Sequence, residues 1–205
     1  MPAGQRKRRT QAERSAETRS LLLDTTIECL ADVGYARTTS AEIATRAGLS
    51  RGAQLHHFGS KQQLVIAAMD QLYFVYEAQF RAALDNLPEG EDPASGAIQA
   101  VWDIMKGPMG HAYLELVATA RVEPDLREPL QALVARMDSG VDTIFREYFD
   151  AAPGTEAMFD LVWTAVFSLV EGLVIETIVR PDDPKVEMVI AMVKQFAPMA
   201  IQSKA

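Results

Sequence analysis

Residues 38–61 read TTSAEIATRAGLSRGAQLHHFGSK, and this stretch decides the fold. Thr39 followed three residues later by Glu42 predicts a capping box at the start of a helix, because each side chain can satisfy a backbone N–H that the first turn leaves unpaired. Gly48 stands where a left-handed residue ends a helix, and Ser50 can cap a second short helix over residues 51–58. Two short helices joined by a Gly-containing turn form a helix-turn-helix, whose second helix enters the DNA major groove.

The identity and spacing of the residues in this region also follow a family pattern. The matching features are Gly34-Tyr35, Thr38-Thr39-Ser40, Ile43-Ala44, Ala47-Gly48-Leu49-Ser50, Arg51-Gly52, His56-His57-Phe58 and Ser60-Lys61. Over about residues 18 to 66 the chain resembles the TetR-like transcriptional regulators. It departs from them at Gln54 and Leu55, where the family usually has an apolar residue and then a tyrosine that commonly contacts DNA. The resemblance therefore does not supply that contact.

The resemblance implies an all-α fold and a regulatory function. An N-terminal three-helix DNA-binding domain with the helix-turn-helix would be joined by a long helix to a C-terminal helical bundle that binds an effector and dimerises. Such a protein is usually a repressor that binds a near-palindromic operator as a homodimer and is released by a small molecule. The partners expected are double-stranded DNA, a second copy of the chain and a small apolar or amphipathic effector. We expect no cofactor and no membrane.

Charge is divided unevenly along the chain. Residues 1–61 hold 10 Lys or Arg and 6 Asp or Glu, a balance of +4, whereas residues 62–205 hold 10 and 22, a balance of −12; together these give the net charge of −8. A basic part would face DNA while the acidic remainder repels phosphate. The single Cys29 lies in an apolar helical pattern and indicates a buried thiol in a reducing cytoplasm. No apolar run follows the basic N-terminal residues, so we expect no secretory signal.

Hydrophobic periodicity and Gly or Pro punctuation divide the chain into helices, without strand-like alternation. The predicted domains are a disordered basic arm at 1–14, a helix-turn-helix domain at 15–61 and an effector-binding and dimerisation domain at 62–205. Outside the motif, the first predicted helix starts at about Ala12 or Ser15 and ends at Val33. The others span about residues 60–84, 95–106, 110–121, 128–150, 155–180 and 184–200. The apolar run 161–179 raises the question of a membrane span, but Glu171 and Glu176 within it favour a buried helix of a soluble protein.

DNA contacts are expected around the second helix of the motif. A helix start binds phosphate through its free N–H groups, Arg51 can donate a bidentate pair to guanine, and Gln54 can pair with adenine if it faces outward. The basic arm either enters the neighbouring minor groove or is a solvated tail. The resemblance adds phosphate contacts from Ser40, Ser50, His56, His57 and Lys61. The full set of candidate DNA contacts is Arg8, Arg9, Thr39, Ser40, Ser50, Arg51, Gly52, Ala53, Gln54, Leu55, His56, His57 and Lys61.

Patterns for metal binding or catalysis are absent from the sequence. Adjacent His56 and His57 point in different directions on a helix, and no Cys or carboxylate stands at zinc-type spacing from them. No Glu-x-x-His pair, Gly-rich phosphate loop or nucleophile arrangement occurs. We therefore predict that the chain is not an enzyme. A DNA binder controlled by a protein partner, or without an effector, is one alternative, and a helical enzyme or ligand-storage protein with a vestigial helix-turn-helix is another.

The second half of the chain is rich in large apolar side chains, most of which should form the core. The resemblance implies an effector cavity between bundle helices. Its candidate residues are Trp102, Met105, Met109, His111, Tyr113, Leu116, Phe145, Phe149, Trp163, Phe167 and Glu171, with His111 and Glu171 as the polar contacts. The helices at 155–180 and 184–200 carry apolar residues on more than one face. The expected dimer interface comprises Phe159, Val162, Val166, Gly172, Leu173, Val189, Val193 and Phe196.

Overall fold

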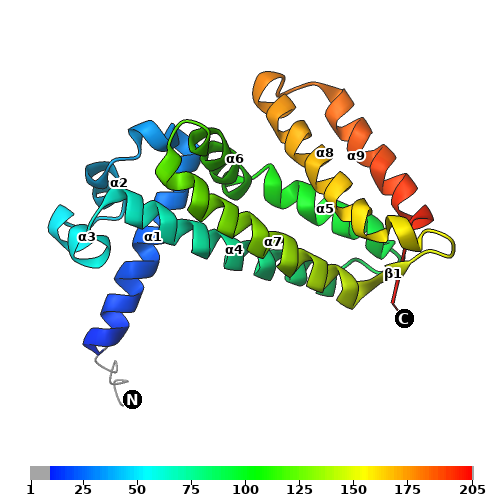
Figure 1. Cartoon of the computed structure of the whole chain (residues 1–205), viewed down its shortest axis with the longest axis horizontal. Helices are drawn as coiled ribbons and strands as arrows, with labels where there is room; N and C mark the ends of the chain where they lie inside the picture. The colour runs from blue at the N-terminus through cyan, green and yellow to red at the C-terminus, as the bar shows by residue number, and fades with distance from the viewer. Residues whose placement is uncertain (1–9, 205) are drawn as a thin grey trace, which may run out of the picture.

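The computed structural model describes residues 10–204, which form an elongated, almost entirely helical molecule. In chain order the helices are α1 (Gln11–Arg37), α2 (Ser40–Arg46), α3 (Arg51–Phe58), α4 (Lys61–Asp85), α5 (Pro93–Met105), α6 (Pro108–Ala120), α7 (Pro124–Tyr148), α8 (Phe159–Val179) and α9 (Pro184–Phe196). Short 3-10 turns, η1 (Glu156–Met158) and η2 (Ala197–Met199), flank the last two helices. Figure 1 shows α2 and α3 at one end of the long axis and α8 and α9 towards the other. The predicted all-α fold is confirmed.

The first helix begins one residue before the earlier of its two expected starts and is kinked near its end. It starts at Gln11 because Thr10 and Glu13 form a capping box, in which the Thr10 hydroxyl accepts from the Glu13 N–H and the Glu13 carboxylate accepts from the Thr10 N–H. Gly34 breaks the helical path with a φ of 74°. A side chain there would be strained, since left-handed backbone disfavours a Cβ. The predicted contacts Arg8 and Arg9 lie outside the described residues.

The long helix α4 connects the helix-turn-helix to the bundle. One core cluster, around Leu22, Ile43 and Phe58, packs the first three helices on the start of α4. A second, larger cluster runs from Val65 along α4 through α5 to α9. Cys29 is buried, as predicted. Because α4 contributes to both clusters, a movement in the bundle can reach the helix-turn-helix through packed side chains.

Two three-residue strands join the end of α7 to the end of the chain. β1 (Phe149–Ala151) and β2 (Ile201–Ser203) pair antiparallel, with Phe149 opposite Ser203. Phe149 and Ile201 are buried, so the pair fixes the C-terminal segment against the bundle. The expectation of a chain without strands is wrong here, because three residues are too few for alternation to show.

The outer side of α8 is exposed rather than buried. The segment Glu156–Val179 passes for a membrane span by length and composition alone, with a mean hydropathy of 1.8, yet only 22 % of that apolar window is buried. Its inner side packs on α5 and α9. The expectation of a buried helix is therefore wrong for the single chain, because within residues 10–204 no element covers the outer side.

Candidate nucleic-acid interface and ligand cavity

The turn into α3 is built from a glycine and a serine. Gly48 has a φ of 66° and follows α2, as the sequence predicts. The Ser50 hydroxyl then accepts from the Ala53 N–H at 3.2 Å and caps α3. A hydroxyl that accepts in this way still has its own hydrogen to donate, so Ser50 can also bind a phosphate oxygen. The start of α3 thus presents a cap, free N–H groups and a partial positive charge.

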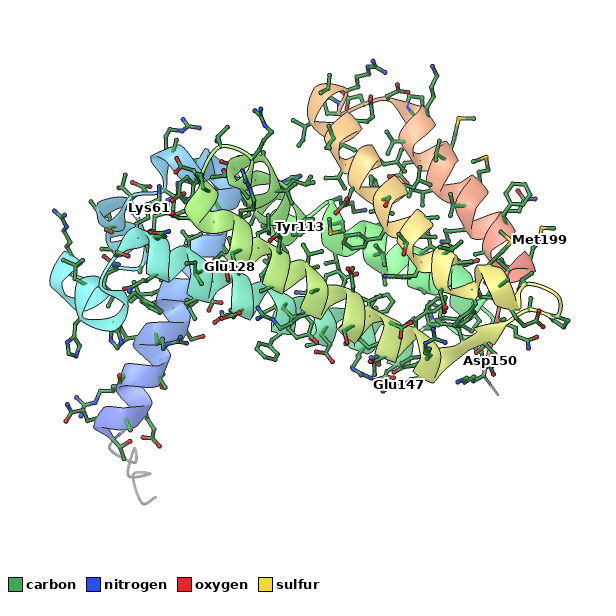
Figure 2. The ribbon with its side chains drawn as sticks, viewed as in Figure 1. Lys61, Tyr113, Glu128, Glu147, Asp150 and Met199 are labelled. Atoms are coloured by element: carbon green, nitrogen blue, oxygen red, sulfur yellow. The ribbon has the colours of Figure 1, made fainter. Side chains whose placement is uncertain are left out.

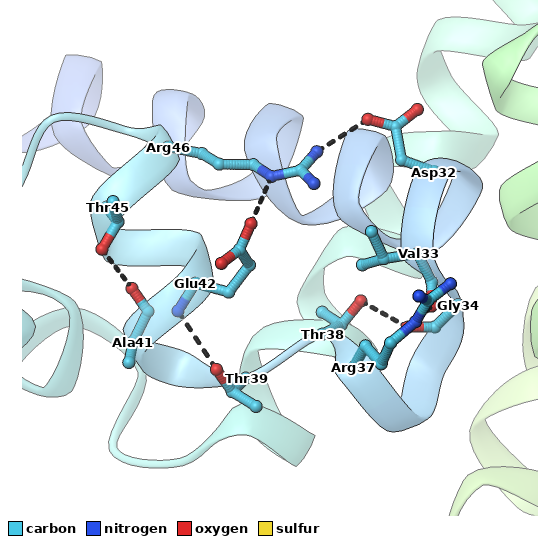
Figure 3. A network of polar contacts seen from close by, with 10 residues as sticks. All are labelled: Asp32, Val33, Gly34, Arg37, Thr38, Thr39, Ala41, Glu42, Thr45 and Arg46. Atoms are coloured by element: carbon cyan, nitrogen blue, oxygen red, sulfur yellow. Dashed lines mark hydrogen bonds and ion pairs between the residues drawn. The ribbon is translucent and has the colours of Figure 1, made fainter.

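Figure 3 shows the polar contacts that fix α2 against α1. The Thr39 hydroxyl accepts from the Glu42 N–H at 3.1 Å. The Glu42 carboxylate does not complete the predicted capping box; it accepts from Arg46 at 2.7 Å, and Arg46 also pairs with Asp32 at 2.7 Å. These bonds hold the guanidinium of Arg46 to two carboxylates. Arg51 differs from Arg46, since it makes no ion pair with any residue from 10 to 204, which leaves its guanidinium for DNA.

Most of the candidate DNA contacts reach the surface. The exposed ones are Thr39, Ser50, Arg51, Gly52, Leu55 and His56. The half-buried ones are Ser40, Ala53, His57 and Lys61. Arg51 and Gly52 stand together at the exposed start of α3, where the absence of a side chain at Gly52 lets the backbone approach a duplex closely.

Gln54 is the exception, because the structure places its side chain inside the domain. Its exposed fraction is 0 %, and neither its amide nitrogen nor its amide oxygen has a hydrogen-bond partner among the described residues. Leu55, the next residue, is 42 % exposed. Pairing of Gln54 with adenine required an outward side chain, and this conformation does not meet that condition, since the helix register turns Leu55 outward instead.

Replacing Gln54 by leucine should stabilise the protein without weakening operator binding. Leucine fills a similar volume and removes two polar atoms that are buried without partners, so we expect the free energy of unfolding to rise by about 1–3 kcal/mol. Denaturant unfolding measures this gain. The matched control is Gln131→Leu on the exposed side of α7, which should stay within about 0.5 kcal/mol of wild type. Loss of operator affinity in Gln54→Leu would show that Gln54 turns outward on DNA.

Lys61 serves the fold in this structure rather than facing solvent as a free cation. Its ammonium donates to the Tyr35 carbonyl at 2.6 Å and lies 3.6 Å from the centre of the Tyr35 ring. Burial lowers the pKa of this lysine, with the Glu123 carboxylate opposing the change. The predicted phosphate contact would need the ammonium to leave both partners. Tyr35 is the packing residue at the helix junction that its position predicts.

The junction at Tyr35 also receives a residue from the bundle. The Tyr35 N–H donates to Glu115 of α6 at 2.6 Å, and the same carboxylate oxygen accepts from the Thr119 hydroxyl at 3.4 Å. A Cβ on Gly34 would lie 3.0 Å from that oxygen, so glycine lets the carboxylate approach the kink. α6 is thereby attached to the point where α1, Lys61 and the start of α4 meet.

A cavity of about 400 Å³ lies between α7 and α8, and we call it the α7/α8 cavity. Its lining comprises Tyr113 of α6, Val134, Met137, Asp138, Val141, Asp142 and Phe145 of α7, and Phe159, Asp160, Trp163, Thr164, Phe167, Ser168 and Glu171 of α8. Figure 2 shows Tyr113 in the middle of the molecule, away from both ends. The volume falls within the range of small-molecule sites, which is about 300–1,000 Å³.

Five of the predicted cavity residues line this space: Tyr113, Phe145, Trp163, Phe167 and Glu171. The prediction is wrong for Trp102, Met105, Leu116 and Phe149, which are at most 1 % exposed and form the core. Met109 borders a different hollow, between α1, α4 and the α5–α6 turn, and His111 lies outside the lining of the α7/α8 cavity. The sequence analysis missed Asp138, Asp142 and Asp160. Asp138 and Asp142 share a helical face with Val134, Val141 and Phe145. Acidic residues within this apolar stripe were the sequence signal that could have predicted them as cavity residues.

The exposed large apolar side chains of α8 and α9 form what we call the α8/α9 apolar face. It comprises Leu161, Leu169, Ile175, Ile178, Val179, Met188, Met192 and Phe196. Of the predicted interface residues, Gly172 and Phe196 are exposed. The prediction is wrong in register for the others: Phe159, Val166 and Leu173 are buried, and Val162, Val189 and Val193 are half-buried against the core. Within residues 10–204, no three His, Cys, Asp or Glu side chains lie close enough to hold a metal ion.

Comparison with known proteins identifies the family of this chain. A family model described as bacterial regulatory proteins, tetR family, matches residues 22–68, which span the helix-turn-helix. The HTH-type transcriptional regulator CymR of Pseudomonas putida is 30 % identical over 184 residues, which cover 89 % of this chain and 90 % of CymR. The chain belongs to the TetR family. It is therefore a DNA-binding transcriptional regulator, and the other TetR-family proteins that it resembles share its all-α fold.

Solved structures extend the likeness over the whole TetR-family fold. A transcriptional regulator from Rhodococcus sp. Rha1 has a TM-score of 0.65 and 21 % identity, covering 89 % of this chain and 97 % of that protein. A putative transcriptional regulator from Saccharomonospora viridis, solved in complex with choline, has a TM-score of 0.66 and 17 % identity, covering 93 % and 100 %. At these identities the likeness shows the fold alone.

Proposed function

We propose that the chain is a cytoplasmic repressor that binds a near-palindromic operator as a homodimer and releases it when a small molecule occupies the α7/α8 cavity. One observation carries this proposal: α6 contributes to both sites. Tyr113 lines the cavity, and Glu115, two residues further, accepts from the Tyr35 N–H at the end of α1. A ligand that displaces Tyr113 would therefore move the residue that holds the helix-turn-helix domain. We keep 15–61 and 62–205 as the proposed domain limits.

Coupling of this kind needs two arrangements of the protein and a ligand that prefers one of them. The start of α4 adjoins α3, and α6 contacts the same junction through Tyr35. A shift of α6 would therefore tilt α3, the recognition helix of the helix-turn-helix. In a dimer such a tilt changes the distance between the two α3 helices, which must match about 34–36 Å, one turn of DNA. Two solved neighbours are in complex with small molecules, choline and imidazole, which supports an effector for this chain.

The α8/α9 apolar face supports the homodimer. Large exposed apolar patches mark interfaces, and the face includes side chains as exposed as Val179 at 69 % and Met188 at 67 %. A two-fold dimer would bury the same face on both copies. It would also leave both α3 helices free, since α3 lies near the far end of the long axis in Figure 1.

Arg51→Ala should weaken binding to the operator by about 1–3 kcal/mol and largely spare binding to random DNA, because it removes a bidentate base contact. Fluorescence anisotropy with labelled operator and labelled random duplex measures both. Arg121→Ala, which removes an exposed arginine after α6, is the matched control and should change neither affinity much. An equal loss on both duplexes for Arg51→Ala would show that Arg51 contacts phosphate instead.

The experiment that tests the proposed function is selection of a preferred duplex from random DNA, followed by footprinting. We expect a near-palindrome whose two half-sites lie about one helical turn apart, with two chains bound. Absence of any sequence preference would contradict the proposal and favour the helical enzyme or storage protein. Sequence-specific binding that no small molecule changes would favour a regulator without an effector or one controlled by a protein partner.

A further inference from the structure

The α7/α8 cavity combines aromatic rings with carboxylates. Five rings line it, from Tyr113, Phe145, Phe159, Trp163 and Phe167. Four carboxylates also line it, from Asp138, Asp142, Asp160 and Glu171, whereas its lining contains no Lys, Arg or His among the described residues. An electronegative, ring-lined site of this kind has a definite preference for ligand charge.

The rings form one continuous run of contacts along the cavity. The Phe145 ring lies 5.0 Å from that of Phe159 and 5.7 Å from that of Trp163, measured between ring centres. Trp163 then lies 6.5 Å from Phe167, and Phe167 lies 6.3 Å from Tyr113. Aromatic faces carry negative charge density and attract cations. The structure already contains one example, because the Arg146 guanidinium lies 5.4 Å from the centre of the Phe159 ring.

The carboxylates divide into two that share one arginine and two that make no ion pair among the described residues. Arg146 pairs with Asp142 at 2.9 Å and also with Asp160. The carboxylates at that end of the cavity therefore already have a counter-ion. Asp138 and Glu171 make no ion pair with any residue from 10 to 204. Burial raises the pKa of the Glu171 carboxyl, a hydrogen bond from Tyr113 opposes the rise, and the Asp138 carboxylate adds to it. Half-buried Glu171 and exposed Asp138 thus line the same space without a counter-ion among the described residues.

We propose that the effector of this chain is an organic cation, an amine or quaternary ammonium compound with a bulky apolar group, whose charge is bound by Asp138 and Glu171 and whose apolar part packs on the aromatic run. This inference deepens the proposed function. It rests on that function only in taking the bound cation to be the molecule that controls operator binding. A neutral ligand of the same shape would fill the cavity but leave both acids without a counter-ion. An anion would be repelled by all four carboxylates.

Three probes that share one apolar group test this preference: 4-tert-butylbenzylamine, which is a cation at neutral pH, 4-tert-butylbenzyl alcohol, which is neutral, and 4-tert-butylbenzoate, which is an anion. Their affinities for the full-length protein without DNA are measured by isothermal titration calorimetry. We expect the amine to bind at least about tenfold more tightly than the alcohol, and the benzoate to bind most weakly. Equal affinities, tighter binding of the benzoate, or no binding of the amine at millimolar concentration would overturn the inference.

Two variants that each remove one charge test whether Asp138 and Glu171 cause the preference for a cation. Asp138→Asn and Glu171→Gln keep the shape of the side chains, so we expect each to reduce the amine-to-alcohol ratio several-fold while the affinity for the alcohol changes little. Asp182→Asn, in the exposed α8–α9 loop, removes the same charge outside the cavity and should keep the wild-type ratio. A wild-type ratio in both cavity variants would overturn the assignment, and circular dichroism checks that each variant is folded.

Operator binding in the presence of each probe separates this inference from the proposed function. Tight, charge-selective binding of the amine that leaves operator affinity unchanged would support the cation site and contradict ligand release. Release of the operator by the alcohol or the benzoate, but not by the amine, would support ligand release and overturn the cation site.

Discussion

Met192→Glu and Ile175→Glu are each expected to yield a monomer that no longer binds the operator at physiological salt. Both side chains are 50 % exposed on the α8/α9 apolar face. In a two-fold dimer each substitution enters the interface twice and buries two unpaired charges, at a cost of several kcal/mol per dimer. A monomer would bring one α3 to half an operator. Size-exclusion chromatography with light scattering, and anisotropy on the operator, measure both effects.

The matched control for these variants is Phe74→Glu. Phe74 is 65 % exposed on α4, outside the α8/α9 apolar face, so the same change of chemistry should leave the dimer and its operator affinity intact. Dimers of normal affinity in both face variants would show that the subunits meet elsewhere. A wild-type protein that is monomeric at micromolar concentration would contradict the proposed homodimer.

Glu115→Ala should leave the cavity able to bind its ligand but uncouple it from the operator. The substitution removes the acceptor of the Tyr35 N–H, and Glu115 is not among the residues that line the cavity. In wild type a coupling free energy of about 1–3 kcal/mol would change operator affinity about 5- to 150-fold on ligand binding. In Glu115→Ala we expect that factor to fall towards one. The part-buried Tyr35 N–H, left without its acceptor, should also cost about 1–3 kcal/mol of stability.

Two further variants make this result specific. Glu115→Gln retains an oxygen that can accept from the Tyr35 N–H and should keep most of the coupling. Glu89→Ala removes an exposed carboxylate in the loop between α4 and α5, away from this junction, and should behave as wild type. Full operator release by the ligand in Glu115→Ala would show that the signal passes through α4 alone.

Local signals in the sequence predicted the helix-turn-helix well. The caps at Thr39, Ser50 and Ser60 and the left-handed Gly48 are all present, and α3 has its predicted limits. These signals work because each depends on a few neighbouring residues and on backbone geometry. The second half of the predicted Thr39–Glu42 capping box is absent. Glu42 pairs instead with Arg46, four residues further along the same helix, and the i,i+4 spacing of this pair was a local signal that the prediction did not use.

The remaining errors concern which side of a helix is covered. Val193 packs against the core while Met192, one residue away and about 100° around the helix, is exposed. In a helix with apolar residues on several faces, periodicity does not show which face a partner helix covers. The same limit left the direction of Gln54 open and placed Met105 in the cavity. The acidic lining of the cavity depends on which faces of α7 and α8 are turned towards each other, which the periodicity of either helix alone does not show.

The most direct test of the account is a titration of the operator with wild-type protein, with and without a small molecule that raises the melting temperature of the protein. We expect the ligand to weaken operator affinity about 5- to 150-fold, corresponding to a coupling of about 1–3 kcal/mol. Because coupling is reciprocal, the operator should weaken ligand binding by the same factor. A ligand that raises the melting temperature and leaves operator affinity unchanged would contradict the account.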